Sequence, residues 1–151
     1  MDRNILIQYV DMKQRIKIIK ERIRKLEKEI TDLRKMEVAD TVKGGYGGTQ
    51  HFKIEGHPDG ILDKKKKLLQ KRKDMLQREE MELLTLTNEA EEYIQSINQI
   101  ELRIMFDFYY LQDLNWTQTA YRMNMMYPNR NIPYTAESCR QRNKRFFEKN
   151  L

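Results

Sequence analysis

The apolar residues between positions 5 and 33 recur at alternating spacings of four and three residues. This average period of about 3.5 residues keeps one apolar seam of a helix facing a partner helix, as in left-handed coiled coils. Lys, Arg, Glu and Gln occupy most of the intervening positions, and they favour helix while remaining solvated. The pattern predicts a long helix over residues 4–38, with a seam formed by Ile5, Tyr9, Met12, Ile16, Ile19, Ile23, Leu26, Ile30 and Leu33.

A second apolar series repeats every seven residues and starts just after Ile61. It predicts a second long helix that is fused to the next helical segment, or only gently broken from it, near residues 96–98. The series consists of Leu62, Leu69, Leu76, Leu83, Ala90, Ile97 and Ile104, with Leu86, Tyr93 and Ile100 three positions after their partners.

Together the two helices predict an all-α chain that begins with a long antiparallel helical hairpin, or coiled coil, over residues 1–96. Each arm of about 35 residues would be about 50 Å long at the rise of an α-helix. The connection is placed at residues 39–60, which contain all six glycines of the chain. Because a two-helix hairpin buries its seam poorly alone, we expect a homodimer through the arms.

The glycine-rich connection gives only weak functional signals. Residues 49–55 are a candidate short strand. Two histidines, His51 and His57, lie in the same region without further ligands at a suitable spacing, so no metal is expected. The sequence lacks the phosphate-binding pattern Gly-x-x-x-x-Gly-Lys-Ser/Thr. We therefore expect a surface connection.

Residues 97–151 have the pattern of a helix-turn-helix domain that starts with a supporting helix over residues 97–111. Asn115 is a suitable N-cap for a short helix over residues 116–123. Two prolines keep residues 126–134 out of helix, and Thr135 is a suitable N-cap for the last helix. The supporting helix is expected to turn inward its apolar residues Ile97, Ile100, Ile104, Phe108 and Leu111.

The last helix is amphipathic and basic. One face carries Ala136, Cys139, Asn143, Phe146 and Phe147, and is expected to pack on the two preceding helices. The other side carries the residue types with which proteins bind DNA: Arg and Lys for guanine edges and phosphates, Gln for adenine and Ser for either. We expect Thr135, Ser138, Gln141, Lys144 and Arg145 to enter a major groove, next to Glu137, and Arg140 and Arg142 to contact phosphates.

The charge of the C-terminal third is polarised. From residue 115 to the end there are seven basic and two acidic residues, whereas residues 84–113 contain six acidic residues and one Arg. A difference of this kind is expected where one side of a domain faces phosphates. Two further basic runs, residues 64–67 and 71–73, are either a second nucleic-acid contact or a solvated face, and the solvated face is the favoured interpretation.

Composition agrees with an elongated cytoplasmic protein that has an anionic partner. Of the 151 residues 34% are charged, with a net charge of +6, and no apolar run reaches the length of about 18 residues that a membrane span needs. Asp2, Arg3 and Asp11 interrupt the first apolar cluster, so no secretion signal is expected. Cys139 is the single cysteine, and we expect it to be a small core residue in a reducing compartment.

The sequence shows no signature of an enzyme. We recognise no paired carboxylates, no activated nucleophile and no metal-ligand cluster, so neither an enzyme nor a cofactor is expected.

The runs Leu-Asn-Trp-Thr-Gln-Thr-Ala-x-Arg-Met at 114–123 and Tyr-Thr-Ala-Glu-Ser-Cys-Arg at 134–140 resemble a known family. It comprises small transcriptional regulators of phages and prophages of Gram-positive bacteria, whose helix-turn-helix is similar to region 4 of the sigma-70 factors. Residues 40–44 and 52–56 resemble the middle region of that family. The resemblance implies a positioning helix at 116–123, a recognition helix from Thr135, double-stranded DNA as a partner and RNA polymerase as a further candidate. The connection at 125–134 is longer than the tight turn usual in the family.

Two other functions fit the same pattern. Small DNA-packaging subunits of phages, which resemble this chain in joining a helix-turn-helix to coiled-coil elements, are one alternative. The other is a coiled-coil module that binds a protein partner and not DNA, in which the basic C-terminal helix is only a solvated face.

Overall fold

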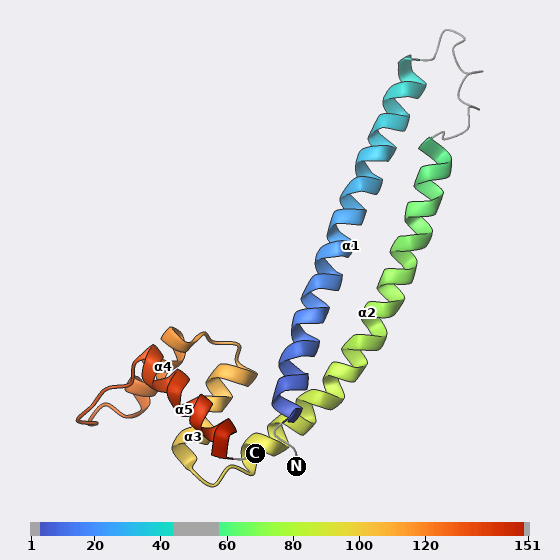
Figure 1. The fold of residues 1–151 in the computed structure, drawn as a ribbon. Helices are drawn as coiled ribbons and strands as arrows, with labels where there is room; N and C mark the ends of the chain where they lie inside the picture. Colours follow the sequence, from blue (N-terminus) through green and yellow to red (C-terminus); the bar gives the residue numbers. More distant parts are fainter. Residues whose placement is uncertain (1–3, 44–57, 150–151) are drawn as a thin grey trace. The chain divides into compact units, whose positions relative to one another are not determined.

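The structure is a computed structural model that describes residues 4–43 and 58–149, with the side chains of residues 4–37 and 60–149. Every regular element in these residues is helical, which confirms the predicted all-α class. The candidate strand at residues 49–55 and both histidines lie outside the described residues. The elements are α1 (Asn4–Lys43), α2 (Pro58–Gln95), α3 (Ile100–Phe106), the π-helical turn η2 (Asp107–Leu111), α4 (Trp116–Met126) and α5 (Ala136–Lys149), shown in Figure 1.

Both long helices extend into the segment that was expected to connect them. Helix α1 continues through Lys43, and α2 starts at Pro58, so parts of the predicted connection at 39–60 are helical. Proline suits the first turn of a helix, where its missing amide hydrogen has no partner to lose. None of the helices in the described ranges combines the length and the apolar character that crossing a membrane requires.

The seam predicted for α1 is largely the buried one. Six of its nine residues are buried, and Ile5, Met12 and Leu33 are partly buried. Leu6, which the pattern omitted, is fully buried. The buried members of the predicted seam are Tyr9, Ile16, Ile19, Ile23, Leu26 and Ile30.

The chain divides into two compact units, and the long helices contribute to both. Unit 1 comprises Met1–Lys13 and Glu82–Leu151, and unit 2 comprises Gln14–Met81. This division differs from the boundary expected at residue 96, because the start of α1 and the end of α2 share one core with α3, α4 and α5.

Within unit 2, α1 and α2 lie side by side and run antiparallel (Figure 1). Their core contains Leu26, Ile30 and Leu62. Three ion pairs show that the two helices run in opposite directions, because a residue farther along α1 pairs with a residue earlier in α2. These pairs are Arg15 with Glu79 at 2.5 Å, Glu27 with Lys73 at 3.3 Å and Glu29 with Lys65 at 2.8 Å. Each of these pairs has at least one exposed side chain, and pairs at the surface contribute about 1 kcal/mol or less, so the apolar seam provides most of the stability.

In unit 1, the core is built around the aromatic side chain of Phe106, which is fully buried. The rings of Phe146 and Phe147 lie 5.0 and 6.3 Å from it, and that of Tyr110 lies at 5.3 Å. Edge-to-face contacts add to the gain from burying apolar area. The aromatic residues of α5 are therefore fixed against α3 and η2.

The face predicted for the supporting helix lies inward except at Ile100. Ile97 is buried, and Ile104, Phe108 and Leu111 are partly buried against the core of unit 1. The chain breaks at residues 96–99, so α3 restarts at Ile100, and this side chain is 64% exposed. In η2 the amide of Gln112 donates to the Asp107 carbonyl at 3.0 Å, a π-type bond that adds one residue to the turn. Met105, Phe106 and Tyr110, which the pattern omitted, are buried as well.

Candidate nucleic-acid interface

Helix α4 starts at the residue that the sequence predicted. The side chain of Asn115 accepts a hydrogen bond from the Gln118 amide at 2.8 Å, and the Gln118 side chain accepts one from the Asn115 amide at 3.0 Å. This reciprocal capping box satisfies two amides of the helix start. The ring of Trp116 stacks on Tyr109 at 3.6 Å, which joins α4 to η2. Helix α4 continues to Met126, three residues beyond the prediction.

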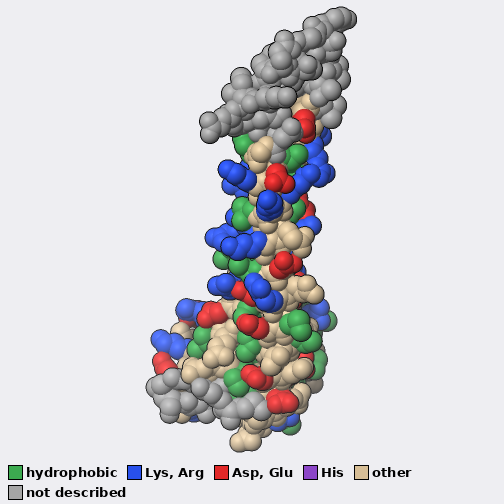
Figure 2. All heavy atoms as spheres, turned by 90° about the vertical axis from the view of Figure 1, so that its right-hand side faces the viewer, with side chains coloured by type: hydrophobic (Ala, Val, Ile, Leu, Met, Phe, Trp, Pro, Cys, Tyr) green, Lys and Arg blue, Asp and Glu red, His purple; other side chains and the backbone are tan. Residues whose placement is uncertain are grey.

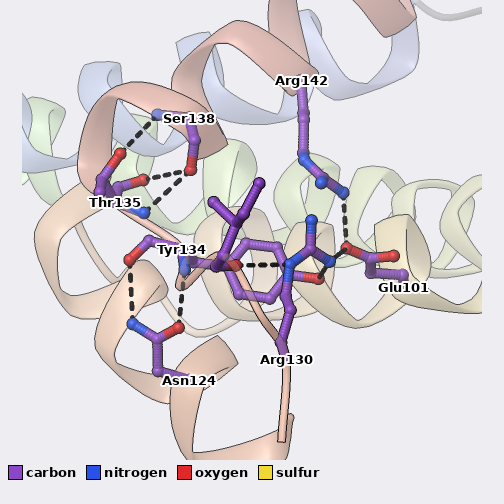
Figure 3. A network of polar contacts seen from close by, with 8 residues as sticks. Glu101, Asn124, Arg130, Tyr134, Thr135, Ser138 and Arg142 are labelled. Carbon is purple, nitrogen blue, oxygen red and sulfur yellow. Dashed lines mark hydrogen bonds and ion pairs between the residues drawn. The ribbon is translucent and has the colours of Figure 1, made fainter. Parts of the chain in front are cut away.

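The connection between α4 and α5 is long, but its end is held to α4. Asn124 donates from its side-chain nitrogen to the Tyr134 carbonyl at 2.9 Å and accepts from the Tyr134 amide at 2.7 Å (Figure 3). One side chain therefore satisfies both backbone groups of the residue just before the N-cap of α5. The ring of Tyr134 is buried. These contacts determine where the last helix starts despite the longer turn.

A carboxylate on α3 joins the connection to α5. Glu101 pairs with Arg130 at 2.7 Å and with Arg142 at 2.5 Å (Figure 3). Both guanidinium groups also lie over the ring of Tyr134, at 4.2 and 5.1 Å from its centroid. Cations are attracted to the face of an aromatic ring, so both the Glu101 carboxylate and the Tyr134 ring hold the two guanidinium groups in place.

This cluster changes the position expected for Arg142. We expected its side chain to contact phosphates at the flank of α5, but in the structure its guanidinium is directed at Glu101 and its side chain is only 29% exposed. Sequence analysis missed the cluster, because Glu101 was considered only as part of an acidic segment. The signal in the sequence was a Glu in the supporting helix and an Arg in each of the two following segments.

The start of α5 is capped as predicted. The hydroxyl of Thr135 accepts from the Ser138 amide at 3.0 Å, and the Ser138 hydroxyl accepts from the Thr135 amide at 2.9 Å (Figure 3). Both residues were predicted to enter a groove. Their hydroxyl groups make local bonds that define the helix start, and their remaining lone pairs are free to accept other donors.

On the outer side of α5, one carboxylate holds two of the predicted DNA-binding residues. Arg140 donates from Nε and Nη2 to Glu137 at 2.7 to 3.0 Å, and Gln141 donates to the same carboxylate at 2.9 Å. The hydrogen bonds from Arg140 and then Gln141 lower the pKa of Glu137 to about 2. Glu137 is therefore ionised at neutral pH, and it competes with any other acceptor for these two donors.

Lys144 and Arg145 differ from Arg140 and Arg142, which are ion-paired. Both are exposed, and neither forms an ion pair with a residue that the structure describes. They follow Gln141 by three and four positions, which places the three side chains on one side of the helix. Both side chains are therefore available to an anionic ligand.

The opposite face of α5 is packed as predicted. Cys139 is fully buried, and burial raises the pKa of its thiol, as expected for a small core residue. Asn143 accepts a hydrogen bond from the Tyr110 hydroxyl at 2.6 Å. Burial also raises the pKa of Tyr110, which keeps this phenol a donor. With this face fixed, the rotation of α5 about its axis is fixed as well.

Among residues 4–37 and 60–149, no group of three or more His, Cys, Asp or Glu side chains is arranged to hold a metal ion. Comparison of the chain with protein-family models, with curated proteins and with solved structures finds no significant match.

Proposed function

We propose that the protein is a sequence-specific DNA-binding transcriptional regulator, and that α4 and α5 form a helix-turn-helix similar to region 4 of the sigma-70 factors. The observation that carries this proposal is the two-sided character of α5. Its inner face is fixed by Cys139 and the aromatic core, and its outer side presents Lys144 and Arg145 to solvent beside the partly buried Gln141. A recognition helix needs both properties, because bases are read only by side chains held in a fixed orientation.

In this proposal, α5 enters the major groove. Arg145 is suited to a bidentate contact with guanine and Gln141 to adenine, and such a pair discriminates against a wrong base by about 1 to 3 kcal/mol. Lys144 and Arg140 contribute contacts to phosphates or bases once Arg140 leaves Glu137. Arg142 acts as a positioning residue through Glu101, and Thr135 and Ser138 define the helix end that approaches the duplex.

The paired helices of unit 2 have a supporting role in this proposal. We infer that they form the arm of a helical hairpin that sets the oligomeric state. Three apolar side chains of these helices are exposed on a surface that is otherwise charged: Met36 by 56%, Ile61 by 41% and Leu68 by 38%. Apolar side chains exposed in this way support a contact with a further helix. The expected assembly is a homodimer through these arms.

The test is selection of binding sites from a pool of random duplexes with the purified full-length protein at low salt. A regulator enriches one related set of sequences, and an unenriched pool that is still retained would show binding without sequence preference. Failure to retain any duplex would contradict the proposal and would favour a protein-interaction module. Light scattering then separates a dimer from the ring of many subunits that DNA packaging requires.

A further inference from the structure

The net positive charge of the chain lies in unit 2. Its sequence, residues 14–81, has nineteen basic and twelve acidic residues, whereas the rest of the chain has ten and eleven. Helix α2 contributes most of the excess, with eight basic and two acidic residues between positions 61 and 78. Figure 2 shows Lys and Arg side chains along the paired helices, with fewer Asp and Glu between them.

Both acidic residues in this part of α2 already have partners. Asp63 pairs with Lys67 at 3.3 Å, and Asp74 accepts a hydrogen bond from Gln70 at 3.0 Å. Lys65 and Lys73 pair with glutamates of α1. The local acids therefore leave several cations of α2 uncompensated.

Three of these cations form a regular row, which we name the basic stripe: Lys64, Lys71 and Arg78. All three are exposed, and none makes an ion pair with a residue in the described part of the chain. Their seven-residue spacing places them on one side of the helix, about 10 Å apart along its axis. The basic stripe is thus a linear array of positive charges without ion-pair partners among the residues that the structure describes.

We propose that the basic stripe binds the phosphates of duplex DNA without reading its sequence. The inference rests on the proposed function, because it assigns a second contact to the same class of ligand. Lys is depleted in protein–protein interfaces and common at phosphates, so a Lys-rich surface fits a nucleic-acid backbone better than an acidic protein. Neutralised phosphates release counterions, which gives the contact a measurable salt dependence.

The experiment measures the affinity of the full-length protein for two duplexes across a range of salt concentrations. One duplex is the sequence selected from the random pool, and the other is an unrelated sequence of equal length. The variant carries Lys64→Gln, Lys71→Gln and Arg78→Gln, which replace exposed residues with another good helix former. We expect an equal fold loss of affinity on both duplexes, and a slope of log affinity against log salt that is shallower by about 1 per lost contact, or about 3 in total.

The matched control carries Lys20→Gln, Lys67→Gln and Lys73→Gln. These lysines are ion-paired, so the control removes the same net charge without removing the basic stripe. We expect a smaller change of slope for the control. A second variant, Lys64→Arg with Lys71→Arg, should keep the wild-type slope, and circular dichroism reports whether each variant keeps its helix content.

Three results would overturn the inference. If the triple variant keeps the wild-type slope of log affinity against log salt, the basic stripe is a solvated surface that does not contact DNA. An equal change in the control would show that net charge alone matters. A wild-type protein that binds neither duplex would overturn both the inference and the proposed function. By contrast, if an Arg145 variant loses its preference between the duplexes while the triple variant keeps the wild-type slope, only the inference about the basic stripe fails.

Discussion

Arg142 of α5 donates to the carboxylate of Glu101 in α3 at 2.5 Å, although the two residues are 41 positions apart in the chain. This contact fixes α5 to the helix behind it. The same carboxylate oxygen also binds Arg130 of the connection. A single oxygen thus joins three segments of unit 1. Its removal should lower the stability of unit 1, whereas the loss of a DNA contact should lower only the affinity for DNA.

Replacing Glu101 with Gln is expected to destabilise unit 1. Two guanidinium groups would lose their anionic partner, and because all three side chains are about a third exposed, we expect a loss of about 1 kcal/mol in the free energy of unfolding. Urea unfolding monitored by circular dichroism provides the measurement. Binding of DNA should weaken without a change in its salt slope. A shallower slope in this variant would instead place Arg142 or Arg130 at phosphates.

Asn124→Ala removes both hydrogen bonds to the backbone of Tyr134. These groups are partly buried, and leaving them unsatisfied is expected to cost about 1 to 3 kcal/mol. Because the bonds hold the residue before the N-cap of α5, hydrogen exchange should also become faster at the start of this helix. Asn129→Ala is the control, since this side chain is exposed in the same connection. Equal unfolding curves for the two variants would contradict the role of Asn124.

Local features of unit 1 could be predicted from the sequence, because their partners lie within three or four residues. Asn115 and Thr135 cap helices through side chains that reach amides three positions ahead. The inner face of α5 follows in the same way from helical periodicity, and Cys139 is fully buried as expected.

Contacts between distant segments could not be predicted, because no spacing rule relates their residues. Lys13 of α1 donates to the Tyr110 carbonyl at 2.8 Å and pairs with Asp113. Asp113 has a positive φ of 58°, a conformation that non-glycine residues rarely adopt, and this ion pair lies at that strained position. The break at residues 96–99 explains why Ile100 does not lie on the predicted inward face, because helical periodicity assumes one continuous helix. The π-helical turn η2, next to Asp113, interrupts the regular turn further along.

Arg145→Ala tests base reading by α5. If Arg145 contacts a guanine, the change should cost about 1 to 3 kcal/mol on the selected duplex and relax preference at one base pair. Site selection repeated with the variant measures this effect. Lys149→Ala is the control, because Lys149 is also exposed and lies in the last turn of the same helix. A uniform loss on all sequences would identify Arg145 as a phosphate contact.

Glu137→Gln is expected to strengthen DNA binding. The carboxylate holds Arg140 and Gln141 through four hydrogen bonds, and it adds a negative charge to the surface proposed to face phosphates. The neutral amide would release Arg140 and remove the repulsion. Fluorescence anisotropy with the selected duplex measures the change, and Glu148→Gln, an exposed acid near the end of α5, controls for net charge. Equal gains from the two variants would argue that net charge alone is responsible.

The bonds of Glu137 also predict how α5 responds to acid. Its pKa is lowered from 4.5 to about 2, mainly by the hydrogen bonds from Arg140. A depressed pKa in the folded protein means that the contact stabilises α5 above pH 4.5, and that this contribution is lost as the pH falls towards 2. An NMR titration of the Glu137 side-chain carboxyl should therefore show a midpoint well below 4.5. In the Arg140→Ala variant the Glu137 midpoint should rise towards 4.5, and an unchanged midpoint would mean that Arg140 is not the cause.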